Sequence, residues 1–337
     1  MNKRLIGGLV LPALLLAAPA GAADLKLVIT ELTTPLIPNS VMDLAHRLGY
    51  YKRAGVDVEI VRVQQTPSAV AALSSGSGDM ANIAFSTALQ LVARDQMKLK
   101  AVVSPDKALP FVIVGKKDIA GVKGLEGRSF GVGRMGSLDH TLSKVVLAKM
   151  GIGDGKLNYV ALGQPSVRAQ SLAAGRVDAT TISIGEWTSL PDKSALGVLV
   201  PQAAFYKAAP MISKVNVVTE ATLKSKGKHV QAMVAAIMAA SRDFAADPKK
   251  WVAAMAEARP DVKRETLESL AEAYRESWSA NGGLNLDEAQ YTTELLYQGE
   301  DFKDLRKVAP AEWIDVTLVD AVRKEAGTVV ALDSPGR

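Results

Sequence analysis

The chain has 337 residues, of which 48% are hydrophobic and 22% charged, with a formal net charge of +5 and no cysteine. The missing thiols exclude disulfide scaffolds, zinc ribbons, iron–sulfur proteins and cysteine nucleophiles, and the high hydrophobic content excludes a disordered chain. A chain of this length can bury a large core and, at roughly 100–200 residues per domain, indicates two domains.

The first 23 residues are typical of an export signal. Lys3 and Arg4 give a basic start, residues 5–18 are apolar and uncharged, and small residues follow at 20–23. The alternative, an uncleaved membrane anchor, needs about 20 apolar residues, more than this run has. We therefore predict a cleaved signal peptide at 1–23 and a soluble product in a bacterial periplasm. Removing Lys3 and Arg4 from the 40 basic residues leaves 38 against 35 acidic ones, a net charge of +3 that gives no support for nucleic-acid binding.

Strands alternate with short helices in the first part of the mature chain. The hydrophobic pattern predicts strands at 25–30, 56–63 and 80–84, with helices at about 41–48, 67–73 and 86–92. Repeated strand–helix units of this length are typical of a mainly parallel sheet covered by helices.

The same order of elements begins again near residue 110. Strands are predicted at 111–114, 129–132, 157–160 and 179–182, and helices at about 138–150 and 166–174. A short motif is repeated in the two halves. Gly76 and Asp79 precede a strand in the first half, and Gly175 and Asp178 precede one in the second. The repetition indicates two similar lobes.

The last third of the chain is predicted to be helical after one further strand at 215–218. Helices are expected at about 227–246, 248–257, 261–278 and 287–298, with Pro248 and Pro260 near two of their starts. A helical tail after two strand–helix lobes suggests that the C-terminal part returns to the first lobe.

Four segments, in this order, resemble one family of binding proteins: Leu48 to Glu59 (LGYYKRAGVDVE), Ala72 to Met80, Leu125 to Val132 and Ala173 to Ala179. They are similar to the periplasmic solute-binding proteins of ABC importers, in the SsuA/THI5-like (NMT1-like) group that takes nitrate, sulfonates, taurine and thiamine precursors. The cysteine-rich stretch of thiamine-precursor members is missing, which argues against that ligand.

The resemblance implies an α/β protein with the two-lobe, type 2 periplasmic-binding-protein fold, each lobe a mainly parallel sheet flanked by helices. We expect lobe 1 at 24–109 and 216–337 and lobe 2 at 110–215. It further implies a small-molecule ligand trapped between the lobes, namely a sulfonate, nitrate, a carboxylate or a nitrogen heterocycle, and an ABC permease in the membrane as docking partner. We expect a monomer that binds no nucleic acid.

Hydroxyl groups follow two strands of the first lobe. In parallel sheets, ligands lie beyond the carboxyl ends of the strands, where loops and helix N-termini meet. Thr33 and Thr34 follow the first strand, and Ser86 and Thr87 stand between a strand and a helix. Turn formation explains the first pair equally well, and helix capping explains the second. We nevertheless predict that all four contact the ligand.

A glycine-rich turn at 131–137 reads G-x-G-x-x-G between a strand and a helix. A dinucleotide site is the alternative, but no acidic residue follows the next strand and nicotinamide cofactors are scarce outside the cytoplasm. We expect instead that the turn presents backbone N–H groups at a helix N-terminus to an anion, with Gly136, Ser137, Arg134 and His140 as ligand contacts. A solvated Arg134 and an ordinary packed His140 are the alternatives.

Glu186 and Trp187 follow the later strand of the second lobe, a place where the family usually has ligand contacts. The indole offers a flat apolar face, and the carboxylate can accept a bond from an amine or a cation. Both are predicted as binding residues, with a core tryptophan and a solvated glutamate as the alternative. Arg134 and Glu186 together would suit a ligand with acidic and basic ends.

Enzymatic chemistry has little support in the sequence. His46, His140 and His229 lie far apart, no H-E-x-x-H or G-x-S-x-G motif occurs, and no acid is identified to orient His140 beside Ser137. We therefore expect a binding protein without catalytic residues, metal or cofactor, which closes about a hinge on its ligand. The alternatives are a periplasmic hydrolase or lyase, or a sensory receptor, on the same fold.

Overall fold

A computed structural model describes residues 23–64, 66–107, 110–153, 155–331 and 333. Of the signal peptide predicted at 1–23, residues 1–22 lie outside the described residues. None of the described helices combines the length and apolarity that crossing a bilayer requires.

Two five-stranded sheets organise the molecule. The first has the order β2-β1-β3-β10-β4, and the second has the order β7-β6-β8-β5-β9. The strands of the first sheet are β1 (Leu25–Ile29), β2 (Val58–Arg62), β3 (Met80–Ala84), β4 (Leu99–Val103) and β10 (Lys214–Thr219). Those of the second are β5 (Phe111–Lys116), β6 (Ser129–Val132), β7 (Asn158–Ala161), β8 (Ala179–Ser183) and β9 (Leu196–Val200).

One strand in each sheet runs against the other four. In the first sheet β1 is parallel to β2 and β3, whereas β10 is antiparallel to β3 and β4. In the second sheet β6 is parallel to β7 and β8, whereas β5 is antiparallel to β8 and β9. Both sheets are thus mainly parallel and share one topology, as the repeated order of elements in the sequence predicts.

The chain passes between the sheets twice, and each passage leads into the reversed strand of the sheet it enters. The first passage joins β4 to β5, and the second joins β9 to β10. We call these passages the crossing segments, and the parts built on the first and second sheets lobe 1 and lobe 2. The boundary predicted between residues 215 and 216 falls inside β10, which begins at Lys214.

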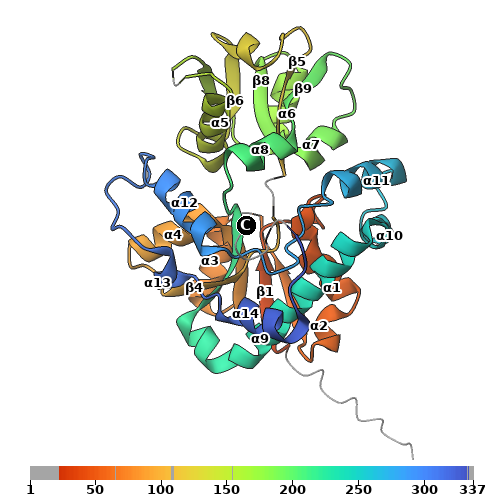
Figure 1. Ribbon diagram of the computed structural model, residues 1–337, viewed down its shortest axis with the longest axis vertical. Helices are drawn as coiled ribbons and strands as arrows, with labels where there is room; N and C mark the ends of the chain where they lie inside the picture. Colours follow the sequence, from red (N-terminus) through yellow and green to blue (C-terminus); the bar gives the residue numbers. More distant parts are fainter. Residues whose placement is uncertain (1–22, 65, 108–109, 154, 332, 334–337) are drawn as a thin grey trace, which may run out of the picture.

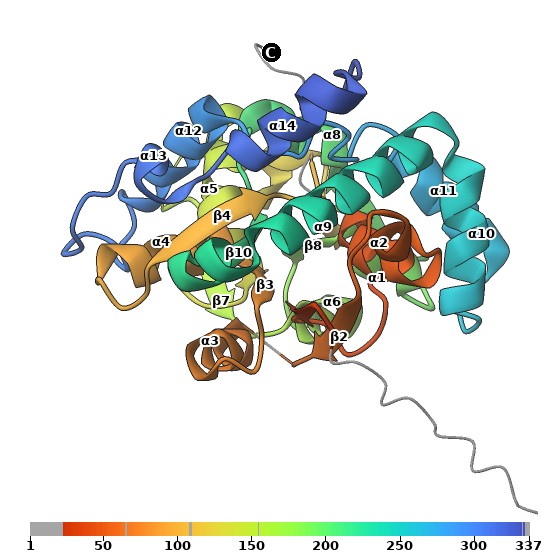
Figure 2. The ribbon, with the colours of Figure 1, turned by 90° about the horizontal axis from the view of Figure 1, so that it is seen from below.

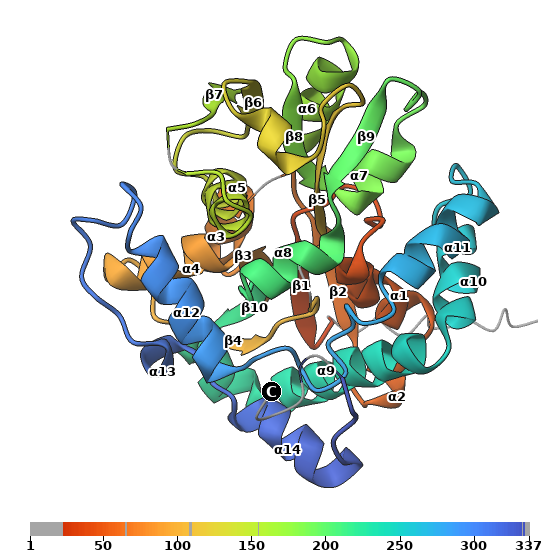
Figure 3. The same ribbon diagram turned by 45° about the horizontal axis from the view of Figure 1, so that its top comes forward.

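Helices cover both faces of each sheet (Figures 1 and 3). Lobe 1 carries η1 (Pro38–Ser40), α1 (Val41–Arg47), α2 (Tyr50–Arg53), α3 (Thr66–Ser75), α4 (Phe85–Ala93), α9 (Glu220–Ala246), α10 (Pro248–Ala258), α11 (Arg264–Ala273), α12 (Leu286–Leu296), α13 (Pro310–Trp313) and α14 (Thr317–Ala326). Lobe 2 carries η2 (Val122–Leu125), α5 (Leu138–Lys149), α6 (Pro165–Ala173) and α7 (Ile184–Ser189), while α8 (Gln202–Ala208) lies in the second crossing segment. Seen from below, α9 crosses lobe 1 with α14 beside it (Figure 2).

The C-terminal helices differ in extent from the sequence-based prediction. The helix predicted at 227–246 is present beyond a kink at Lys226, and a further helical part precedes the kink from Glu220, where the Thr219 side chain caps it. The helix predicted at 261–278 spans only Arg264–Ala273, and α13 and α14 were not predicted. Pro248 and Asp247 mark the start of α10 as expected, because proline suits the first helical turn and the aspartate accepts the Lys249 N–H.

The repeated Gly and Asp residues have the same role in both lobes. Gly76 and Gly175 have φ of +72° and +71°, a left-handed conformation that ends the preceding helix. Asp79 then accepts the N–H of Lys26 at 2.9 Å, and Asp178 accepts that of Ser129 at 2.9 Å. Each carboxylate therefore anchors the first residues of the neighbouring central strand, β1 or β6.

Hydrophobic clusters fill the space on both sides of each sheet. The largest lies between the first sheet and α1, α9, α10 and α11, and includes the fully buried Trp251, Tyr274 and Trp278. The second cluster of lobe 1 contains Phe85 packed edge-on against Trp313 at 4.8 Å. Since residues 220–326 provide much of this packing, the C-terminal helices complete lobe 1.

Candidate functional site

A cavity of about 580 Å³ lies between the lobes, at the ends of the strands that the two sheets direct toward each other. Lobe 1 lines it with Thr30, Glu31, Thr33, Pro35, Leu36, Ile37, Gln64 and Arg259. Lobe 2 contributes Gln164, Pro165, Ser166, Ser183, Gly185, Glu186 and Ser189, and the crossing segments with the adjoining strand starts contribute Asp106, Pro110, Phe111, Ser213 and Lys214. We call this space the interlobe cavity.

The lobe 1 wall is the loop that follows β1. Lys214, at the start of β10, reaches this loop and donates to the Thr30 hydroxyl at 3.2 Å and to the Glu31 carboxylate at 3.5 Å. Arg259 donates from Nη1 to the Thr34 carbonyl at 3.0 Å and from Nε and Nη2 to Asp261. The loop is therefore held on both sides by basic residues from distant parts of the chain.

The lobe 2 wall is formed by the N-terminal turns of α6 and α7. Pro165 begins α6, and the Ser183 hydroxyl caps α7 by accepting the Glu186 N–H at 3.1 Å. Arg168 is buried beneath this wall and donates to the carbonyls of Gly163 and Thr181. These bonds fix the two helix starts relative to β7 and β8.

The lobes touch beside the cavity. A Cβ placed on Gly185 would lie 3.0 Å from the Leu36 carbonyl oxygen and 3.3 Å from the Leu36 Cβ. Helix α7 also packs against α11 of lobe 1. A side chain at position 185 would interfere with this approach, so glycine permits the lobes to close here.

Two acidic side chains in the cavity have unusual environments. Asp106 is only 8% exposed, and burial raises its pKa to about 6 against the attraction of Lys214. Burial also raises the pKa of Glu186, the Glu31 charge raises it further, and the Arg168 guanidinium lowers it. Both carboxylates are therefore poorly solvated in the absence of a ligand.

The predicted site residues fall into two groups. Thr33 and Glu186 line the interlobe cavity. Thr34 is buried and binds Arg259 through its carbonyl, and Trp187 is half-buried with the Lys193 ammonium 5.7 Å from its ring centre. Neither of the latter two lines the cavity, although both directly follow a residue that does.

The other predicted residues do not line this cavity. Ser86 and Thr87 are half-buried in the first turn of α4, where neither side chain caps the helix. Arg134, Gly136, Ser137 and His140 belong to the turn after β6 and the start of α5. Arg134 pairs with Asp301 of lobe 1 at 2.8 Å, so this turn forms a second contact between the lobes.

Neighbouring side chains accept hydrogen bonds from N–H groups of the glycine-rich turn. Gly133 donates to Asp139 at 2.7 Å, Gly136 donates to His140 Nδ1 at 2.9 Å, and the Arg134 N–H approaches the Ser137 hydroxyl at 3.3 Å. These acceptors are all within the turn and the first residues of α5. The turn as it stands is thus bonded internally, and its contact with an anion stays a prediction.

Sequence reasoning missed Asp106, Lys214 and Arg259. Asp106 comes two residues after a serine that ends the strand at 99–103, but it precedes a segment without helical or strand periodicity. Lys214 and Arg259 reach the cavity only because β10 and the end of α10 pack on lobe 1. A polar residue shortly after a strand gives no usable signal for Asp106, because the strand at 99–103 was not itself predicted, and nothing local marks the other two.

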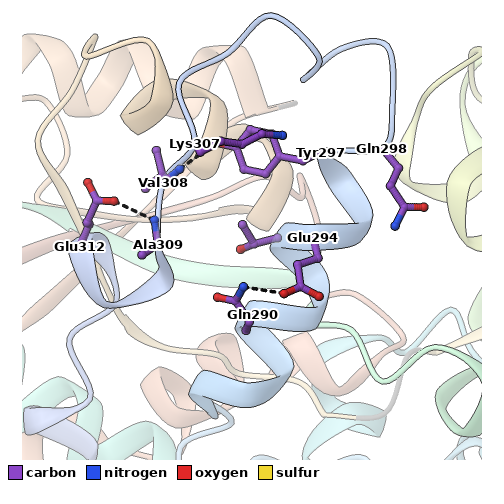
Figure 4. A pocket seen from close by; sticks show the side chains of 9 residues that line it. Gln290, Glu294, Tyr297, Gln298, Lys307, Val308, Ala309 and Glu312 are labelled. Atoms are coloured by element: carbon purple, nitrogen blue, oxygen red, sulfur yellow. Dashed lines mark hydrogen bonds between the residues drawn. The ribbon is translucent and has the colours of Figure 1, made fainter.

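A second pocket, of about 560 Å³, lies on the surface of lobe 1 between α12 and the segment before α13 (Figure 4). Gln290 donates to Glu294, the Ala309 N–H donates to Glu312, and Lys307 lies 3.9 Å above the Tyr297 ring. Its lining residues all come from 290–312, and none comes from lobe 2. It therefore lacks the two-sided enclosure of the interlobe cavity.

In the part of the chain that the structure describes, no three His, Cys, Asp or Glu side chains are grouped so as to hold a metal ion.

Comparison with known proteins gives one family and many similar structures. The family model described as NMT1/THI5 like matches residues 41–251. No curated protein matches the sequence.

Three solved structures illustrate the likeness in fold. The periplasmic aliphatic sulphonate binding protein SsuA from Escherichia coli is 17% identical with a TM-score of 0.69, covering 86% of this chain and 91% of that one. The periplasmic nitrate-binding protein NrtA from Synechocystis PCC 6803 is 13% identical with a TM-score of 0.70, covering 93% and 92%. The ligand-binding component of an ABC-type import system from Staphylococcus aureus, with zinc bound, is 18% identical with a TM-score of 0.68, covering 88% and 98%. At these identities the likeness shows the two-lobe fold of periplasmic binding proteins.

Proposed function

The chain belongs to the NMT1/THI5-like family, and from this premise we propose that it is the substrate-binding component of an ABC importer. It captures a small polar organic solute between its lobes and delivers it to a membrane permease. An N-terminal sequence typical of a cleaved signal peptide supports a periplasmic location.

The interlobe cavity is the observation that carries this proposal. Its lining comes from both lobes and both crossing segments, so a ligand in it contacts parts that can move relative to each other. A ligand that touches both lobes favours the form in which they are close, because it has more contacts there. The permease then distinguishes the loaded, closed protein from the empty, open one.

Binding without turnover is the expected chemistry. The cavity is lined by hydroxyls, amides, carboxylates and two basic groups, and none of the three histidines of the chain lines it. The similar structures reported above bear the names of binding proteins. A hydrolase or lyase, and a sensory receptor, remain as outcomes of the test.

The test is mass spectrometry of the small molecules that the purified mature protein releases on denaturation. We expect one compound in near-stoichiometric amount, which binds again to refolded protein and is recovered unchanged after prolonged incubation. Chemical conversion of the compound would favour the enzyme. Binding without any uptake defect after deletion of the gene would favour the sensory receptor.

A further inference from the structure

The basic groups of the interlobe cavity are already engaged within the protein. Among the described residues that line it, Lys214 and Arg259 are the cationic ones. Lys214 is 3.5 Å from Glu31, and Arg259 forms a two-pronged ion pair with Asp261, at 2.9 and 2.7 Å, besides its bond to Thr34. Arg168, behind the wall, has bonds to two carbonyls and lies 3.7 Å from Asp139. An anionic ligand would have to compete with these carboxylates.

Two of the acidic groups have no direct ion pair among the described residues, although Lys214 attracts Asp106 and Arg168 attracts Glu186 from a greater distance. Asp106 lines the cavity, is more than nine-tenths buried, and its Oδ1 has no hydrogen-bond partner among the described residues. The Glu186 side chain has no ion pair or hydrogen bond of its own within the described part of the chain, whereas its backbone N–H is held by Ser183. Asp106 is buried and Glu186 is half-buried. A carboxylate removed from water without a direct partner is costly, so these two groups favour a ligand that supplies positive charge and N–H donors.

The two carboxylates belong to different parts of the fold. Asp106 is in the first crossing segment, and Glu186 is in the first turn of α7 in lobe 2. On the lobe 1 side, Glu31 is close enough for its charge to act on Glu186. A cation held between Asp106 and Glu186 would draw the lobes together. If lobe 2 moved away, the distance between the cation and one of these two carboxylates would increase.

We propose that the interlobe cavity takes a small organic cation whose protonated nitrogen is held between the carboxylates of Asp106 and Glu186. This rests on the proposed function and specifies its ligand class as a primary or secondary ammonium, an amidinium or a guanidinium. Phe111, Pro110 and Leu36 supply apolar surface for the rest of the molecule. The hydroxyls of Ser166, Ser183 and Ser213 are available for its polar groups.

The experiment uses two sets of probes that differ in charge and little in size. One set is benzamidinium, benzamide and benzoate, and the other is propylammonium, propionamide and propanesulfonate. Affinities for the ligand-free mature protein are measured by calorimetry at pH 7.5. We expect the cation of at least one set to bind at least tenfold more tightly than its neutral and anionic counterparts.

Substitutions of the two carboxylates test whether the cation binds between them. Asp106→Asn and Glu186→Gln, which keep the shape of each side chain, should each weaken the binding of the preferred cation at least tenfold. Glu325→Gln removes the same charge at an exposed position of α14 and should leave the affinity unchanged. Circular dichroism and thermal unfolding establish that each variant is folded.

Three results would overturn the inference. These are tighter binding of an anion than of the cation in both sets, failure of both cations to bind, and binding of the cation that neither Asp106→Asn nor Glu186→Gln weakens. The proposed function is judged separately, by the compound released on denaturation. Release of an unchanged anionic solute that rebinds in the interlobe cavity would sustain the importer and exclude the cation.

Discussion

Asp106 illustrates how a binding residue can reduce the stability of the empty protein. Its side chain is buried in the first crossing segment, and its pKa is raised from 3.8 to about 6. A shift of this size corresponds to about 3 kcal/mol. Because the folded state binds this proton more tightly than the unfolded chain does, the contribution of Asp106 to stability is fully present below pH 3.8 and is lost as the pH rises through 6.

The first prediction follows from the raised pKa of Asp106, which makes its charged form unfavourable in the folded protein. Asp106→Asn should raise the free energy of unfolding of the ligand-free protein by about 1–3 kcal/mol at pH 7.5 and change it little at pH 4. Urea denaturation at the two pH values measures the difference. Lys214 and the buried Tyr274 are the titratable groups that interact with Asp106, and both are kept in the variant. Equal effects at both pH values would show that the charge of Asp106 is not the cause.

Asp178 behaves in the opposite way. Bonds from Lys116 at 2.8 Å and from the backbone and hydroxyl of Ser129 at 2.9 and 2.7 Å hold its pKa well below the ordinary value. Its ionised form is therefore favoured by folding, and the stabilisation is present at neutral pH and lost as the pH falls below about 4.

The second prediction is that Asp178→Asn destabilises the protein by about 1–2 kcal/mol at pH 7, because bonds to the charged carboxylate are lost. The penalty should shrink below pH 4. Asp79→Asn, the equivalent change in lobe 1, should act in the same direction, because Asp79 accepts from Lys26 and Lys226 in the same arrangement. Urea titrations at several pH values measure both. A penalty for Asp178→Asn that grows toward low pH would contradict the assignment.

At the scale of elements, the sequence predicted most strands and helices of the two lobes, but it missed the edge strands β4 and β9 and the short helices α2, α7, α8, α13 and α14. The alternation of strands and helices, the reuse of one order in both halves and the repeated Gly–Asp motif all rest on local patterns, and local patterns determine them in the structure. The place of β10 between β3 and β4 does not follow from its own residues, Lys214–Thr219. Only packing of the whole lobe determines it.

In the candidate site, too, some residues follow from local sequence patterns and others only from the packing of distant segments. That Glu186 lines the cavity could be predicted because it comes shortly after a strand, at a place where the resembled family usually has ligand contacts. Asp106 could not, because its burial arises where the crossing segment passes beneath residues 274–278, which are far away in the sequence. The glycine-rich turn is predicted to bind an anion, and this stays a prediction. In the structure Asp139 and His140 accept two of its N–H groups, an arrangement that the sequence pattern did not show.

The third prediction concerns the contact between α7 and the loop after β1. Gly185→Ala adds a Cβ 3.0 Å from the Leu36 carbonyl oxygen, so the lobes cannot approach as closely. Ligand affinity should fall about tenfold, whereas the melting temperature of the empty protein should not fall, because alanine favours the helix. Calorimetry with the released compound measures the first and thermal unfolding the second.

Gly197→Ala is the matched control, since a Cβ there has no neighbour within 4 Å. It should leave the ligand affinity unchanged. Unaltered affinity in Gly185→Ala would mean that closure at Leu36 is not needed for binding.

At the scale of the whole molecule, two lobes of equal topology enclose the interlobe cavity. They touch beside it through Gly185 with Leu36, and elsewhere through the Arg134–Asp301 ion pair, whose residues do not line the cavity. The Arg134 and Asp301 side chains are 63% and 33% exposed, so this ion pair contributes less than about 1 kcal/mol. The ion pair thus adds little to the packing of α7 on α11, and a ligand that contacts both lobes would favour the closed form further.

Hydrogen–deuterium exchange of the mature protein, with and without the compound that it releases, tests the central claim most directly. A ligand that bridges the lobes should protect residues 30–37 of lobe 1 and residues 183–189 of lobe 2 together, with protection of the crossing segment around Asp106. Segment 290–312, which lines the surface pocket of Figure 4, should not change. Protection confined to one lobe, or to that surface pocket, would contradict the account.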